Sequence, residues 1–212
     1  MHAYLDIHYG PEAMRHLILA DKALAPYIEK FGRVSAKRDP DIFAVLVSSI
    51  IADGVAAATA LGVERRLIAH CGAITAENIL KADLGKLRET GLSQTKIATI
   101  RDIAQKIASK QLDLNDTLHF DDDEYVAFLA GIKGVGRHAA EATAIFGEGR
   151  LDVFVYADPL VQKAVMKVHG YTSYSLERHE RLKKQYSPYG TLATLYYYAI
   201  AEGLPQGVGR KG

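Results

Sequence analysis

The chain has 212 residues, of which 49% are hydrophobic and 24% charged, a composition that supports a packed core and excludes a disordered protein. Its 26 Lys and Arg nearly balance 25 Asp and Glu, so the net charge of +1 excludes nucleic-acid binding through a strongly basic tail. The single cysteine, Cys71, excludes a disulfide framework and a four-cysteine zinc or iron–sulfur site within the chain. The length fits one domain or two interlocked lobes.

No apolar run reaches the length of a membrane span. The longest, residues 42–52, is interrupted by two serines and covers about half a bilayer. The first ten residues carry charged and polar side chains and lack the apolar core of a signal peptide. We therefore expect a soluble cytoplasmic protein, associated with the nucleoid if the source is prokaryotic, with no membrane partner.

Helical patterns follow one another along the chain. Residues 26–31 end at Gly32, as a helix with a glycine stop. Pro40 is expected in the first turn of the next helix, which runs to about residue 52 and is apolar on almost every face, as a buried central helix is. Four further helices are expected. The first covers residues 63–71, the second begins after an N-cap at Thr75, the third is short and ends at Gly91, and the fourth covers residues 93–107 with Ser93 as its N-cap.

Few segments alternate with a period of two. The best strand candidate, residues 151–155 (Leu-Asp-Val-Phe-Val), is short and isolated, so we interpret it as an extended connector. The predicted fold class is therefore all-α.

Residues 121–147 predict two helices joined by a tight hairpin. Four acidic residues, 121–124, favour a helix start, and the turn at residues 132–136 reads Ile-Lys-Gly-Val-Gly. Its glycines permit close approach of another backbone and conformations that other residues avoid. We expect the N–H groups of Val135, Gly136 and Arg137 to point outward, where they bind a phosphate without requiring net positive charge.

This hairpin and its flanking segments resemble the helix-hairpin-helix (HhH-GPD) DNA glycosylases, closest to the branch of 3-methyladenine DNA glycosylase II. Asp158 lies 20 positions after His138, in a stretch (DVFVYADPLVQKA) similar to the one that carries the catalytic aspartate of the family. The segments LAPYIEKFG, DPDIFAVLVSSII, GLSQTKIATIRDIA and YSPYGTLATLYYYA extend the resemblance, in the family order, from about residue 17 to residue 204.

The resemblance implies a two-lobed helical fold with a cleft between the lobes. Residues 1–40 plus 150–212 would form the terminal lobe, and residues 41–149 the central lobe that ends in the hairpin. It also implies a base excision repair enzyme that flips a damaged, alkylated purine out of double-stranded DNA and hydrolyses its N-glycosidic bond. We expect a monomer with no cofactor and no iron–sulfur cluster, except Na⁺ or K⁺ held at the hairpin by the backbone carbonyls of Ile132 and Val135.

Asp158 is implied to be the catalytic carboxylate, which stabilises positive charge on the sugar or activates the attacking water. Because Pro159 follows it, Asp158 is also a good helix N-cap, and the two roles are compatible. His138 stands where the strand-cleaving members carry a Lys nucleophile. Imidazole forms no stable imine, so lyase activity is not expected.

The resemblance also implies a base pocket, for which His138, Tyr156 and Tyr198 are the candidates. His138 replaces a Trp that stacks on the flipped base in the alkylation-repair branch, and its alternative is a helix-surface histidine. Tyr198 matches a Trp that lines the pocket, but residues 196–198 are three adjacent tyrosines that cannot all face one pocket, so plain core is the alternative. The candidate DNA-binding residues form the hairpin: Lys133, Gly134, Val135, Gly136 and Arg137. Lys133 is expected to contact phosphate rather than to act as a nucleophile.

Two departures from the family leave a second hypothesis open. Residues 52–54 (Ala-Asp-Gly) stand where the branch usually has a Gln-containing turn that plugs the gap left by the flipped base, and Gly190 stands where an Arg is usual. Glycine cannot act as a plug, and Asp53 repels phosphate. The alternative is a catalytically silent helix-hairpin-helix DNA-binding protein. Residues 207–211 imitate a hairpin motif, but only one residue follows them, so we expect a frayed tail.

Overall fold

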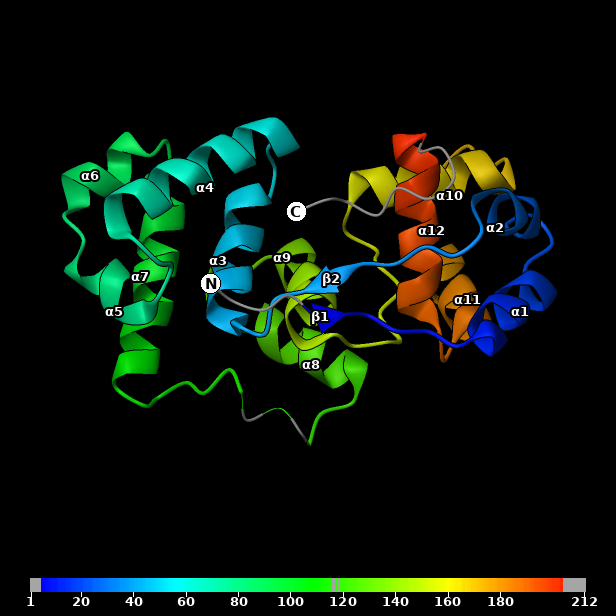
Figure 1. Ribbon diagram of the computed structural model, residues 1–212, viewed down its shortest axis with the longest axis horizontal. Coiled ribbons are helices and arrows are strands. Elements are labelled where there is room, and N and C mark those ends of the chain that lie inside the picture. Colours follow the sequence, from blue (N-terminus) through cyan, green and yellow to red (C-terminus); the bar gives the residue numbers. More distant parts are fainter. Residues whose placement is uncertain (1–4, 116, 118, 204–212) are drawn as a thin grey trace. The chain divides into compact units, whose positions relative to one another are not determined.

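The computed structural model of the protein describes residues 5–115, 117 and 119–203, so the motif at residues 207–211 lies outside it. Over the described residues the chain is helical, apart from one antiparallel pairing of β1 (Leu5–Asp6) with β2 (Lys37–Arg38) (Figure 1). The all-α prediction is confirmed. None of the helices in this part of the chain is long and apolar enough to cross a membrane.

The described chain divides into two compact units. One contains the residues up to Arg38 and those from Glu148 onward, and the other is Asp39–Gly147. The second unit, here called the central unit, contains α3 (Ile42–Ala52), α4 (Ala57–Cys71), α5 (Ala76–Lys81), α6 (Leu84–Glu89), α7 (Gln94–Ala108), α8 (Asp122–Ala130) and α9 (Arg137–Thr143), which continues into a π-helical turn, η1 (Ala144–Glu148).

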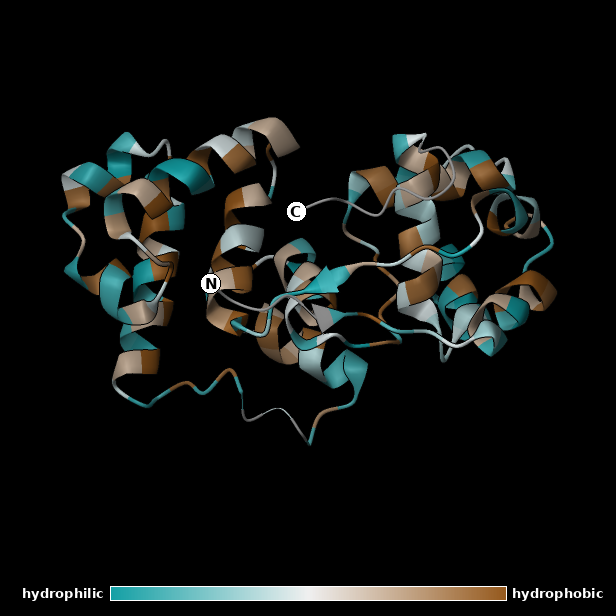
Figure 2. Cartoon of the chain, viewed as in Figure 1, coloured by the Kyte–Doolittle hydropathy of each residue, from teal (hydrophilic) through white to brown (hydrophobic). Residues whose placement is uncertain are grey.

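Helix α3 is the buried centre of this unit, as its apolar pattern predicts. It packs against α4, α7 and α9, and Figure 2 shows its apolar residues in brown. Asp41 is its N-cap and accepts a hydrogen bond from the backbone N–H of Ala44 at 3.0 Å. Pro40 therefore lies one residue before the cap, and the prediction that it occupies the first turn was wrong.

Side-chain caps fix the starts of three more predicted helices, α5, α7 and α8. Thr75 and Ser93 each accept a hydrogen bond from the backbone N–H three residues later, both at 3.2 Å. Asp121 and Glu124 form a reciprocal capping box at the start of α8. These predicted helix starts are confirmed.

The terminal unit is built around α12. Its helices are α1 (Pro11–Ala20), α2 (Ala25–Phe31), α10 (Pro159–His169), α11 (Leu176–Tyr186) and α12 (Gly190–Glu202). Helix α12, orange to red in Figure 1, packs against all four others and is buried along most of its length. It is therefore the element on which the rest of this unit is assembled.

Candidate active site

Asp158 ends an extended segment and is the N-cap of α10. Its Oδ1 accepts a hydrogen bond from the backbone N–H of Leu160 at 2.7 Å, and its Oδ2 accepts one from the hydroxyl of Tyr198 at 2.8 Å. The residue is 7% exposed. The capping role expected from the Asp-Pro sequence is confirmed, and the contact with Tyr198 is a partner that the sequence did not reveal.

The segment that leads to Asp158 is extended but belongs to no sheet, because threonine hydroxyls of α12 bind its backbone. Thr191 Oγ1 accepts a hydrogen bond from Val153 N–H at 3.0 Å and donates one to the carbonyl of Arg150 at 2.7 Å. Thr194 Oγ1 accepts from Val155 N–H at 3.0 Å and donates to the carbonyl of Val153 at 3.1 Å. The prediction of an extended connector is confirmed, and its polar groups are satisfied by helix side chains.

Gly190 departs from the family pattern for a steric reason. A Cβ at this position would lie 2.9 Å from Asp152 Oδ1 and 3.0 Å from the backbone nitrogen of Phe154. The backbone N–H of Gly190 also donates to Asp152 Oδ1 at 2.8 Å. A side chain at this position would therefore require Asp152 and the backbone at Phe154 to shift, so glycine suits the close approach of α12 to this segment.

The three adjacent tyrosines of α12 have different environments. Tyr196 and Tyr197 are fully buried, and their hydroxyls bond to the carbonyl of Gly32 at 2.8 Å and to the hydroxyl of Tyr186 at 2.6 Å. Tyr198 is only partly buried. It is therefore the member of the trio whose ring retains access to solvent.

Tyr156, the other aromatic candidate of this unit, is half-buried in a cluster of rings. Its ring centroid lies 4.9 Å from that of His179 and 5.9 Å from that of Tyr174. Its carbonyl accepts a hydrogen bond from Gln162 Nε2 at 2.8 Å. These contacts hold the ring against the start of α11, and its assignment to a base pocket stays a prediction.

The hairpin between α8 and α9 depends on Gly134. Its φ of +87° is a backbone conformation that favours glycine. A Cβ there would also overlap Thr99 Oγ1 of α7 and lie 2.9 Å from Thr99 Cγ2. Thr99 therefore packs closely against the turn, a contact that the sequence analysis did not predict.

The amide of Val135 does not point outward as expected. It donates to the carbonyl of Ile132 at 2.9 Å, closing the turn, and the Val135 side chain is buried. The expectation of an outward-pointing Val135 N–H was wrong, because this donor forms a hydrogen bond within the turn. Arg137 is engaged too: its Nε donates to Oε1 of the buried Glu141 at 2.7 Å. Lys133, by contrast, is exposed.

Asp53, the residue that departs most from the family pattern, lies against the hairpin. Its Oδ1 is 3.5 Å from His138 Nδ1, and its Oδ2 would lie 2.8 Å from a Cβ at Gly136. Lys96 Nζ donates to the carbonyl of Asp53 at 2.7 Å and to that of Ile51 at 2.9 Å. Partial burial lowers the pKa of Lys96, and the charge of Asp53 opposes that shift. The end of α3 is thus fixed beside the hairpin.

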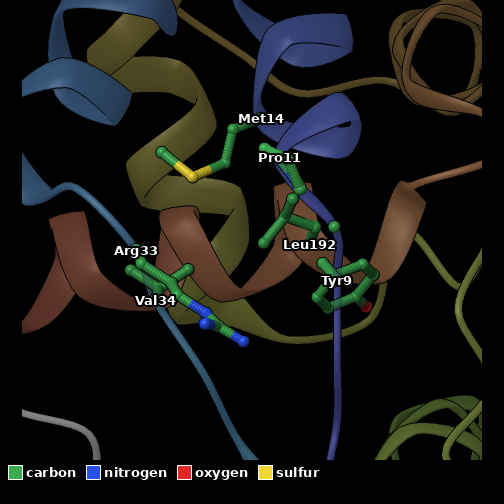
Figure 3. Close-up of a pocket in the computed structure, with 7 residues that line it drawn as sticks. Tyr9, Pro11, Met14, Arg33, Val34 and Leu192 are labelled. Atoms are coloured by element: carbon green, nitrogen blue, oxygen red, sulfur yellow. The ribbon is translucent and has the colours of Figure 1, made fainter.

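A separate pocket of about 150 Å³ lies in the terminal unit (Figure 3). Its lining is mostly apolar and consists of Tyr9, Gly10, Pro11, Met14, Arg33, Val34 and Leu192. None of the candidate site residues lines it.

Comparison with known proteins agrees with these features. Alkylbase DNA glycosidase-like protein mag2 of Schizosaccharomyces pombe is 25% identical over 196 residues, covering 89% of this chain and 92% of that protein. The putative DNA-3-methyladenine glycosylase YfjP of Bacillus subtilis is 29% identical over 128 residues, 59% of this chain and 44% of that protein. A crystal structure of a DNA-3-methyladenine glycosidase from Bacillus halodurans superposes with a TM-score of 0.75 at 27% identity, covering 94% of this chain and 92% of that one.

The family model for the HhH-GPD superfamily base excision DNA repair protein matches residues 47–188. This range contains the glycine hairpin, His138 and the capped Asp158, and it spans more than half of the chain. The chain therefore belongs to the HhH-GPD superfamily of base excision DNA repair proteins.

Proposed function

We propose that the protein is a DNA glycosylase that removes an alkylated purine from double-stranded DNA, acting as a cytoplasmic monomer. The observation that carries the proposal is the carboxylate of Asp158, which is held at two points within the matched region. The similarity to an alkylbase glycosidase-like protein and to 3-methyladenine glycosylases supports the choice of substrate.

Asp158 acts on the sugar. When the glycosidic bond breaks, positive charge develops on the deoxyribose, and a fixed carboxylate stabilises it or activates the attacking water. Asp158 lies at the N-terminus of α10, where the helix dipole stabilises negative charge. A residue placed in this way needs no reorganisation at the moment of reaction.

The enzyme is monofunctional in this proposal. Formation of an imine with the opened sugar requires an amine, and position 138 offers an imidazole. The Nδ1 of His138 lies 3.5 Å from Asp53 Oδ1, and we assign the imidazole to stacking on the base or hydrogen bonding with it, as the family resemblance implies. Tyr156 and Tyr198, which are both partly exposed, are the residues of the terminal unit that we assign to contact with the base.

The hairpin contacts the DNA backbone. The exposed Lys133 and the amides of Gly136 and Arg137 bind phosphate, while Gly134 and Val135 shape the turn. The backbone carbonyls of Ile132 and Val135, on either side of Gly134 in the sequence, are the proposed ligands of a Na⁺ or K⁺ ion. Carbonyl oxygens are suitable ligands for such cations. The Ile132 carbonyl, which accepts one hydrogen bond, has a second lone pair. A cation held there would add positive charge beside the phosphate.

A second candidate function is silent DNA binding on the same scaffold. The position of Asp53 favours it, because this carboxylate, beside Gly136 and His138, stands where the family usually has the residue that plugs the gap left by a flipped base.

One assay separates the two candidates. Duplexes carrying 3-methyladenine, hypoxanthine or 1,N6-ethenoadenine are incubated with the protein and then treated with hot alkali, which cleaves at abasic sites, or with borohydride, which traps imines. Alkali-dependent cleavage without a trapped adduct supports a monofunctional glycosylase. DNA binding without release of any base supports the silent protein.

A further inference from the structure

Helix α12 carries a row of hydroxyl groups along one face. Thr191, Thr194 and Tyr198 follow the spacing i, i+3 and i+7, which places their side chains on the same side of a helix. We call these three residues the hydroxyl stripe. Each member bonds to the segment 150–158, and the contacts advance along that segment as the helix advances.

The first two members hold the backbone. The side chain of Thr191 joins the carbonyl of Arg150 to the N–H of Val153, and that of Thr194 joins the carbonyl of Val153 to the N–H of Val155. Both threonines are fully buried. A buried hydroxyl that both donates and accepts is costly to lose, because its removal leaves buried backbone groups unpaired. The path of the segment is therefore fixed by α12.

The third member holds the carboxylate itself. Tyr198 donates to Oδ2 of Asp158 at 2.8 Å, while the N-terminal turn of α10 holds Oδ1 through the N–H of Leu160 at 2.7 Å. Helices α12 and α10 thus each donate a hydrogen bond to one oxygen of the Asp158 carboxylate. A carboxylate that is hydrogen-bonded at both oxygens cannot rotate freely, so its orientation is fixed before DNA binds.

The two tyrosines that precede Tyr198 in α12 bind other parts of the terminal unit. Tyr196 donates to the carbonyl of Gly32, and Tyr197 bonds to Tyr186 in the buried interior. The hydroxyls of Tyr196 and Tyr197 therefore bind partners outside the segment 150–158.

We infer that Tyr198 is a positioning residue for Asp158, acting through its hydroxyl, and that the hydroxyl stripe determines where the catalytic carboxylate stands. This inference rests on the proposed function, which gives Asp158 its role. It differs from a base-pocket role for Tyr198, which would require only the aromatic ring.

The test removes the hydroxyl and keeps the ring. Tyr198→Phe should slow single-turnover release of the damaged base by roughly 10–100-fold, the range expected for loss of a hydrogen bond to a charged group, with an unchanged dissociation constant for DNA. Tyr196→Phe is the matched control, because it removes a hydroxyl from the same helix whose partner is the Gly32 carbonyl. It should release base at the wild-type rate.

A second measurement reports the contact independently of catalysis. In protein labelled with ¹³C at aspartate carboxyl carbons, the Asp158 resonance, assigned as the one missing from Asp158→Asn, should shift in Tyr198→Phe and stay in place in Tyr196→Phe. If Tyr198→Phe fails to fold, Thr194→Val tests the same stripe. Its rate of base release should fall, without a change in DNA affinity.

The outcomes separate this inference from the proposed function. A wild-type rate or an unshifted resonance in Tyr198→Phe, with Asp158→Asn inactive, would overturn the positioning role and leave the glycosylase assignment intact. Equal losses of rate and of DNA affinity in Tyr198→Phe would assign Tyr198 to binding and also overturn it. A wild-type protein that releases no base, or an Asp158→Asn variant that is fully active, would overturn both.

Discussion

At the scale of single residues, Asp53 is the clearest departure from the family and the residue whose charge is easiest to test. Its carboxylate lies 3.5 Å from His138 Nδ1 and abuts Gly136, beside the amides that we assign to phosphate binding. A negative charge in this place weakens the attraction for DNA, and the effect is larger at low salt.

Asp53→Asn should therefore tighten binding to undamaged duplex DNA by about five-fold at low ionic strength, corresponding to about 1 kcal/mol between unit charges near 4 Å in water. Fluorescence anisotropy across a salt series measures this change. Asp102→Asn is the control, since Asp102 is paired with Lys106 on the exposed surface of α7. Weaker binding of Asp53→Asn would mean that Asp53 organises the hairpin rather than opposing phosphate.

Some contacts of single residues could be predicted from the sequence, and others could not. The Asp-Pro pair predicted the N-cap at position 158, because a cap depends on residues that are neighbours in the chain. The Tyr198 contact spans 40 positions and Thr99 lies in a different helix from the hairpin, so neither contact leaves a local pattern. Likewise, no motif indicates that Lys96 binds the carbonyls at the end of α3.

At the scale of elements, the hairpin is held in shape by one glycine. Gly134→Ala places a Cβ against Thr99 at a positive φ, which costs about 1–2 kcal/mol in backbone strain before the overlap is counted. The dissociation constant for duplex DNA should rise roughly tenfold or more, as measured by anisotropy.

Gly72→Ala provides the matched comparison for this variant. Gly72 has a φ of +80° in the same unit, and a Cβ there would come no closer than 4.0 Å to Asn78. It should lose stability to backbone strain and keep its affinity for DNA. If the two variants bound DNA equally well, the hairpin would not be the main phosphate contact.

Helices with caps or strong apolar periodicity could be predicted, and others could not. Helix α3 and the starts at Thr75, Ser93 and Asp121 follow from local signals. Helix α4 begins at Ala57, six positions before its predicted start at 63, because its first turns are mostly exposed and carry no periodic pattern. Helix α1 was not predicted, because Gly10 at its N-cap position has no side chain that could signal the helix start.

At the scale of the whole molecule, a buried polar cluster in the terminal unit links folding to pH. Asp21 Oδ2 accepts a hydrogen bond from Tyr186 at 2.5 Å and lies 3.3 Å from His169 Nε2. Burial alone would raise the pKa of Asp21, but the hydrogen bonds from His169 and Tyr186 bring it below its ordinary value. Burial raises the pKa of Tyr186 and of Tyr197, which keeps both phenols protonated as donors.

A lowered pKa in the folded state means that ionised Asp21 contributes stability above about pH 4 and that this contribution is lost as the pH falls through the folded-state pKa. Asp21→Asn should lower the free energy of unfolding by about 2 kcal/mol at pH 7, and the difference should shrink toward pH 3. Urea unfolding at both pH values measures it. A deficit of the same size at both would show that the loss is one of packing and not of charge.

The role of Asp158 is tested most directly by the rate at which a 3-methyladenine duplex loses its base to wild-type protein and to Asp158→Asn. The wild type should release the base, and the variant should release it about 10²–10³-fold more slowly, because an amide cannot balance the charge that develops on the sugar. Its affinity for DNA should be unchanged or slightly tighter, since a negative charge near phosphates is removed. An Asp158→Asn variant as active as the wild type would contradict the assignment of this carboxylate to catalysis.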